Sequence, residues 1–84
     1  MSNLMQTTPC NQPTQAQRVL DALHAEMRCR VLSLAADFDR LQRATGGESL
    51  LRDDRRIAEL RQCIKLLLND EPNRAERVQM VLSD

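Results

Sequence analysis

Residues 20–41 read LDALHAEMRCRVLSLAADFDRL, and the spacing of their apolar side chains decides the fold. Successive apolar positions are three or four residues apart, which places them on one stripe of an α-helix, while most charged residues fall on the other side. A double step of four around Met27 interrupts a strict heptad. The stripe consists of Leu20, Leu23, Met27, Val31, Leu34, Phe38 and Leu41.

Both ends of this helix are marked in the sequence. Thr14 followed by Gln17 matches the capping box, in which each side chain satisfies a backbone N–H of the first turn. Gly46 and Gly47 are expected to end the helix, because glycine suits the left-handed conformation just beyond a helix. We therefore predict a long helix over residues 14–45.

A second apolar stripe follows the two glycines. It predicts a helix over residues 49–69, and the short connection should return this helix antiparallel along the first. Between Leu50 and Ile57, the heptad repeat places Asp53 at a position where an apolar residue is expected. Two interpretations of Asp53 remain open. The favoured one starts the helix at Asp53 or Asp54 with Asp53 as the N-cap, and the other starts it at Ser49 with a carboxylate in the apolar seam. The stripe consists of Leu50, Ile57, Leu60, Ile64 and Leu67.

The acidic turn at residues 69–72 is expected to end the second helix and to start a short third helix over residues 72–82. Residues 1–13 are predicted to be a flexible tail, so one helical domain occupies residues 14–84. The sequence thus predicts an all-α fold, a long antiparallel helical hairpin with a short third C-terminal helix. A chain of 84 residues has little core, so we expect it to self-associate as a homo-oligomer such as a dimer.

The charge balance argues against electrostatic binding to nucleic acid or to a membrane surface. Twelve basic and twelve acidic residues cancel, with four of each sign in residues 1–42 and eight of each in residues 43–84. No apolar run is long enough for a membrane span or a signal peptide. The three cysteines match no disulfide framework, so a reducing cytoplasm is the expected location.

No catalytic, cofactor-binding or metal-binding residue is predicted, and we expect a protein that is not an enzyme. His24 lies five residues before Cys29, which does not align two metal ligands on one helical face. Cys29 and Cys63 are expected to be buried small apolar residues, whereas Cys10 lies in the tail. The residues predicted to bind a partner protein are therefore the two apolar stripes, from Leu20 to Leu41 and from Ile57 to Leu67.

A small DNA-binding or anti-activator transcriptional regulator is the alternative function. A helix–turn–helix could pass through residues 69–72, and arginines lie on both sides of this turn. Each basic cluster is interleaved with acidic residues, which is the pattern of exposed intrahelical pairs and would repel phosphates. The basic residues are Arg52, Arg55, Arg56, Arg61, Lys65, Arg74 and Arg77.

Residues 57–83, IAELRQCIKLLLNDEPNRAERVQMVLS, resemble the paired C-terminal helices of flagellar export chaperones of the FliT type. In both, a leucine-rich helix ends at an acidic turn, here Leu-Leu-Leu-Asn-Asp-Glu, and a charged amphipathic helix follows. The resemblance covers about a third of the chain. It implies a bacterial helical chaperone or adaptor of the flagellar or type III secretion kind, which covers an amphipathic helix of a partner protein.

Overall fold

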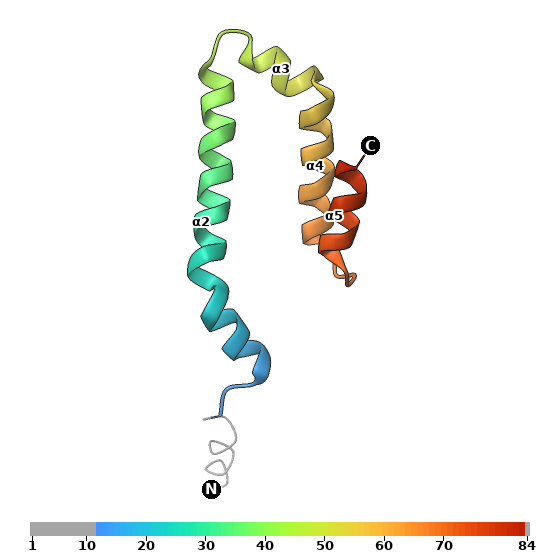
Figure 1. Ribbon diagram of the computed structural model, residues 1–84. Coiled ribbons are helices and arrows are strands. Elements are labelled where there is room, and N and C mark those ends of the chain that lie inside the picture. The colour runs from blue at the N-terminus through green and yellow to red at the C-terminus, as the bar shows by residue number, and fades with distance from the viewer. Residues whose placement is uncertain (1–11, 84) are drawn as a thin grey trace, which may run out of the picture. The chain divides into compact units, whose positions relative to one another are not determined.

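The computed structural model describes residues 12–83, and within this range the predicted all-α fold is confirmed. Its helices, in chain order, are α2 (Gln15–Arg43), α3 (Gly47–Asp53), α4 (Arg55–Leu68) and α5 (Arg74–Leu82), and this part of the chain contains no strand (Figure 1). Most of the predicted tail, residues 1–11, lies outside the described residues.

The chain divides between Asp37 and Phe38 into two units, and α2 continues through the boundary. The described part of the first unit is the N-terminal segment of α2. The second unit contains the end of α2 together with α3, α4 and α5. The predicted packing of the second helix along the first stays a prediction.

The capping box at the start of α2 is confirmed. The Gln17 backbone N–H donates to Thr14 Oγ1 at 3.1 Å, and the Thr14 backbone N–H donates to Gln17 Oε1 at 2.8 Å. Two backbone donors that the first helical turn leaves unpaired are thus satisfied by side chains. This exchange fixes the start of α2 at Gln15.

The two glycines connect α2 to α3 in different ways. Gly46 has a φ of 81°, the left-handed conformation that the sequence predicted after the helix. Gly47 is buried, and a Cβ atom there would lie 1.8 Å from the Leu41 carbonyl oxygen. The start of α3 therefore rests directly on the last turn of α2, with no space for a side chain at Gly47.

The predicted helix over residues 49–69 is divided into α3 and α4, and neither interpretation of Asp53 is correct. Asp53 is the last residue of α3, with an exposed side chain near Arg52, and it is neither a cap nor part of an apolar seam. Asp54 has extended backbone and is the N-cap of α4, accepting a hydrogen bond from the Arg56 backbone N–H at 2.8 Å. Either of the two consecutive aspartates could have capped α4. Only Asp54 has its carboxylate bound by the guanidinium of an arginine that follows it, Arg56.

α5 begins at Arg74, two residues later than the predicted start at Pro72. Asn73 has a φ of 64° and a ψ of 40°, a left-handed conformation that an α-helix does not contain. The connection is held by arginine side chains, because Arg74 donates to the carbonyl oxygens of Leu67 and Asn69, and Arg77 donates to that of Pro72.

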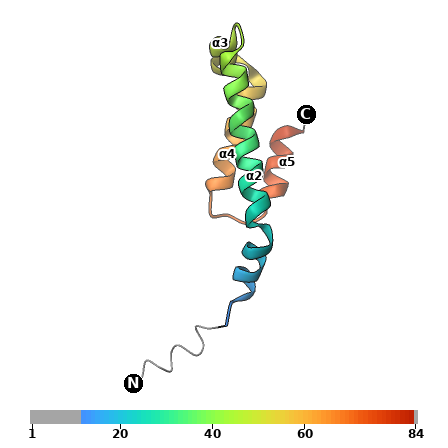
Figure 2. The same ribbon diagram turned by 90° about the vertical axis from the view of Figure 1, so that its left-hand side faces the viewer.

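α5 packs antiparallel on α4, as both views of the ribbon show (Figure 1 and Figure 2). The core of this pair is small, because Ile57 and Cys63, at 5% and 7% exposed, are the only buried hydrophobic residues of the described chain. Other apolar side chains of this pair are half-buried, namely Leu60, Ile64, Leu66, Val78 and Val81.

Candidate protein-binding surface

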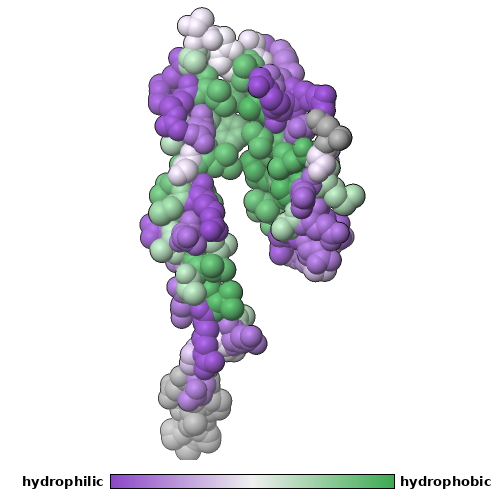
Figure 3. Space-filling model, viewed as in Figure 1, coloured by the Kyte–Doolittle hydropathy of each residue, from purple (hydrophilic) through white to green (hydrophobic). Residues whose placement is uncertain are grey.

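The first unit exposes a row of large apolar side chains along α2. None of the residues of α2 is buried. On the predicted stripe, exposure runs from 37% at Leu34 to 68% at Val31, with Leu20, Leu23 and Met27 between these values. We call these five residues the α2 stripe, and hydrophobic patches lie along this helix between hydrophilic ones in the space-filling view (Figure 3).

One apolar residue beside the α2 stripe widens it, and another lies further around the helix. Val19 and Leu32, at 51% and 64% exposed, were not part of the predicted stripe. Val19 lies four residues before Leu23, and a shallow depression near the start of α2 is lined by Gln15, Ala16, Val19, Leu20, Leu23 and Met27. A second depression is lined by His24, Met27, Arg28, Val31 and Leu32. The (i, i+4) relation of Val19 to Leu23 was the sequence signal that could have extended the stripe.

The other predicted partner-binding residues have a different role, since many of them form the core of the second unit. Ile57 is buried, and Leu60, Ile64 and Phe38 are half-buried. Leu41 and Leu67 stay exposed at the ends of α2 and α4. One predicted set thus contains both exposed residues on α2 and buried or half-buried residues of the second unit.

Cys29 is exposed, which contradicts the expectation that it is buried, whereas Cys63 is buried as expected. Cys29 lies two residues after Met27 and two before Val31. Because consecutive helical residues are about 100° apart, this spacing puts Cys29 on the side opposite the α2 stripe. Cys10 lies outside the described residues.

Charged side chains flank the surface but do not interrupt it. Arg30 and Glu26 form an (i, i+4) ion pair at 3.1 Å, and both side chains are 68% exposed. An exposed pair of this kind contributes little to stability. Its position beside Met27 matters more, because it places one charge of each sign at the edge of the α2 stripe.

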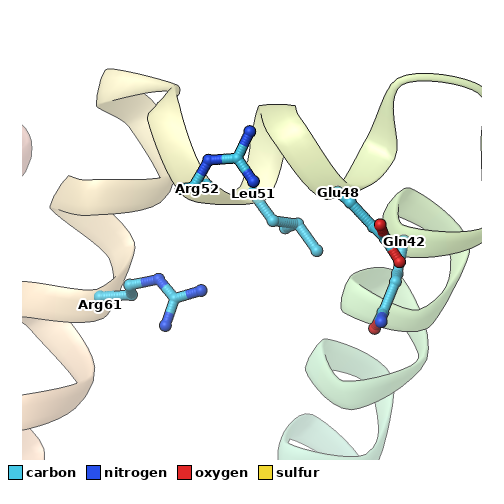
Figure 4. A pocket seen from close by; sticks show the side chains of 5 residues that line it. All are labelled: Gln42, Glu48, Leu51, Arg52 and Arg61. Atoms are coloured by element: carbon cyan, nitrogen blue, oxygen red, sulfur yellow. The ribbon is translucent and has the colours of Figure 1, made fainter.

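A hollow in the second unit is polar. It is lined by Gln42 at the end of α2, by Glu48, Leu51 and Arg52 of α3, and by Arg61 of α4 (Figure 4). This lining offers hydrogen-bonding groups and charges of both signs.

Most arginines of the second unit are engaged with acidic groups or carbonyl oxygens. Arg55 pairs with Glu59 at 3.2 Å, and Arg77 pairs with Glu71 at 2.8 Å. Arg56 donates from two guanidinium nitrogens to the two oxygens of Asp54, each at 3.0 Å. This fork lowers the pKa of Asp54 from 3.8 to about 2 and raises the pKa of Arg56.

Within residues 12–83, no group of three or more His, Cys, Asp or Glu side chains is placed to hold a metal ion. In the same range, no helix combines the length and the apolar character that a membrane span requires. The chain matches no protein-family model, no curated protein and no solved structure in the comparisons with known proteins.

Proposed function

We propose that this chain is a small, non-enzymatic protein-binding module whose α2 stripe covers an amphipathic helix of a partner protein. The observation that carries the proposal is the exposure of all five apolar residues of the α2 stripe. Exposed apolar rows of this length on a helix are typical of helix-to-helix recognition, in which anchors recur every three or four residues. The flanking charges then set the specificity of pairing.

The biological setting that we propose is a bacterial chaperone or adaptor of the flagellar or type III secretion kind, acting in the cytoplasm. The resemblance of residues 57–83 to export chaperones of the FliT type supports this class. In this proposal, the second unit holds a compact helical pair and the α2 stripe does the binding. A chaperone of this kind would keep its partner's apolar helix from aggregating.

The alternative, a small DNA-binding regulator, has less support from the geometry. Binding to DNA needs arginines that are available to phosphates or base edges. Those around the turn between α4 and α5 are instead held by Glu71 and by backbone carbonyl oxygens. Retention on DNA-cellulose that decreases steeply with salt would favour this alternative.

Site-specific photo-crosslinking tests the proposed function. A photoreactive amino acid at Leu23, on the α2 stripe, should capture a discrete protein in cells of the source organism. The same amino acid at Cys29, on the opposite side of the same helix, is the matched control and should capture nothing. Equal capture from both positions, or none from Leu23, would contradict binding through the α2 stripe.

A further inference from the structure

The spacing of apolar residues on α2 is symmetric about Met27. Going outward from Met27, the next apolar position is four residues away on each side, at Leu23 and Val31, and the following one is three further, at Leu20 and Leu34. A further step of four in each direction reaches Ala16 and Phe38, which also belong to α2. A row that reads the same from both ends can pack against a reversed copy of itself.

We propose that a second copy of this chain covers the α2 stripe, with the two α2 helices antiparallel and a twofold axis passing beside Met27. In a twofold interface, when residue i of one copy contacts residue j of the other, residue j of the first copy also contacts residue i of the second. The arrangement places Met27 opposite Met27, Leu23 opposite Val31, and Leu20 opposite Leu34. All five exposed residues of the α2 stripe then face apolar side chains of the other copy.

The charges of this segment are compatible with self-association. The part of α2 within the first unit carries three basic and three acidic residues, so two copies do not repel each other through net charge. Glu26 and Arg30 lie along one edge of the α2 stripe. In the antiparallel pair, Arg30 of one copy comes within about 3 Å, along the helix axis, of the level of Glu26 of the other.

At the opposite edge of the α2 stripe, the antiparallel pair brings two like charges close together. Arg28 lies on that edge, and the two copies of Arg28 come close to the twofold axis. Arginine has a long side chain that can extend into solvent from the edge of a helix pair. The repulsion between the two guanidinium groups is therefore expected to be weak.

The antiparallel orientation is the one that the reversal symmetry of the row allows. In this orientation the two consecutive steps of four around Met27 lie on the twofold axis, so the interruption of the heptad occurs at the same level in both helices. An in-register parallel pair would align these steps as well, so the crosslinking pattern below distinguishes the two orientations.

This inference uses the same surface as the proposed function, and it implies that a protein partner must compete with the second copy. The two claims are tested separately. The proposed function is tested by capture of another protein, whereas the self-association is tested on the purified full-length chain alone. A chain that captures a partner yet never dimerises would overturn only the present inference.

Disulfide crosslinking tests the arrangement. The parent is the full chain with Cys10→Ser and Cys29→Ser, which keeps the buried Cys63 and should not crosslink. Met27→Cys in this parent should form a covalent dimer in a glutathione redox buffer. Leu20→Cys and Leu34→Cys should each stay monomeric in reducing-agent-free gels when alone, and should form the mixed dimer when combined.

A parallel pair would differ at the outer positions, because Leu20→Cys and Leu34→Cys would then each crosslink with itself, whereas Met27→Cys would crosslink in either orientation. Sedimentation equilibrium of the wild-type chain should give about twice the 9.6 kDa chain mass. Met27→Glu should give the monomer mass, whereas Cys29→Glu, the same change on the opposite side of α2, should leave the dimer intact. A wild-type monomer, or equal effects of the two glutamates, would overturn the proposal.

Discussion

Asp54 ends one helix and begins the next, because its backbone N–H makes the last hydrogen bond of α3 and its side chain caps α4. Its carboxylate binds the Arg56 backbone N–H and the Arg56 guanidinium, while its own N–H donates to the Leu50 carbonyl oxygen. One residue thus serves as the C-cap of α3 and the N-cap of α4. The ionised form of Asp54 is the one that this arrangement stabilises.

This geometry makes part of the stability depend on pH. The pKa of Asp54 is lowered from 3.8 to about 2, mainly by the hydrogen bonds from Arg56. Because the folded pKa lies below the unfolded one, the contribution is present above about pH 4 and is lost as the pH falls toward about 2. Asp54→Asn keeps a capping acceptor without the charge, so we expect a lower denaturation midpoint than wild type at pH 6 and the same midpoint near pH 2.

Urea denaturation of both chains between pH 2 and pH 6 measures this difference. Asp53→Asn is the matched control, because Asp53 is exposed and caps no helix. It should follow the wild-type curve throughout. A constant gap between wild type and Asp54→Asn across the whole pH range would show that the charge of Asp54 does not stabilise the fold.

Local signals allowed the sequence to predict some of these residues and not others. The capping box at Thr14 and the left-handed glycine at Gly46 depend only on near neighbours in the chain, and both were predicted correctly. The choice of Asp54 over Asp53 depends on the position of the Arg56 guanidinium. The left-handed Asn73 depends on the turn that Arg74 and Arg77 hold through distant carbonyl oxygens. Neither dependence appears in apolar periodicity.

At the level of helices, α4 and α5 stabilise each other around a very small core. Ile57 is 5% exposed, and few other side chains of the unit are buried to that degree. Truncating a buried isoleucine to alanine removes apolar contact and leaves a cavity, at a cost of about 2–5 kcal/mol. In a unit with so few buried residues, that loss is a large part of the total stability.

We therefore expect Ile57→Ala to lower the free energy of unfolding by about 2–5 kcal/mol, as measured by chemical denaturation followed by circular dichroism. Leu68→Ala is the control on the same helix, because Leu68 is 80% exposed. Its effect should stay within about 0.5 kcal/mol. Similar losses in the two variants would mean that Leu68 is covered in solution and that the core is not centred on Ile57.

The apolar stripes illustrate what periodicity can and cannot predict about helices. Steps of three and four residues identified the apolar faces of both α2 and α4. Periodicity does not distinguish a face that is covered within its own unit from one that is exposed. Ile57 and Val31 both belong to apolar stripes with steps of three and four residues, yet Ile57 is buried and Val31 is 68% exposed. The tertiary contacts of α4 with α3 and α5 separate the core from the candidate binding surface.

For the molecule as a whole, the two units have different sources of stability. α4 and α5 hold each other through contacts within one chain. In the described part of the first unit α2 is the only helix, and most of the stability of a helix in a protein comes from packing of its apolar face. If a second copy covers the α2 stripe, then the order of this segment must depend on protein concentration, whereas that of the second unit must not.

Amide hydrogen exchange at two protein concentrations a factor of about one hundred apart tests this coupling, because association shifts stability by mass action. Protection of α2 amides before Phe38 should increase at the higher concentration, while protection in α4 and α5 stays unchanged. In Met27→Glu, the same α2 amides should exchange rapidly at both concentrations, because the dimer is lost. Strong α2 protection at both concentrations that also persists in Met27→Glu would instead mean that the stripe is covered within its own chain, since intramolecular packing depends neither on concentration nor on the dimer.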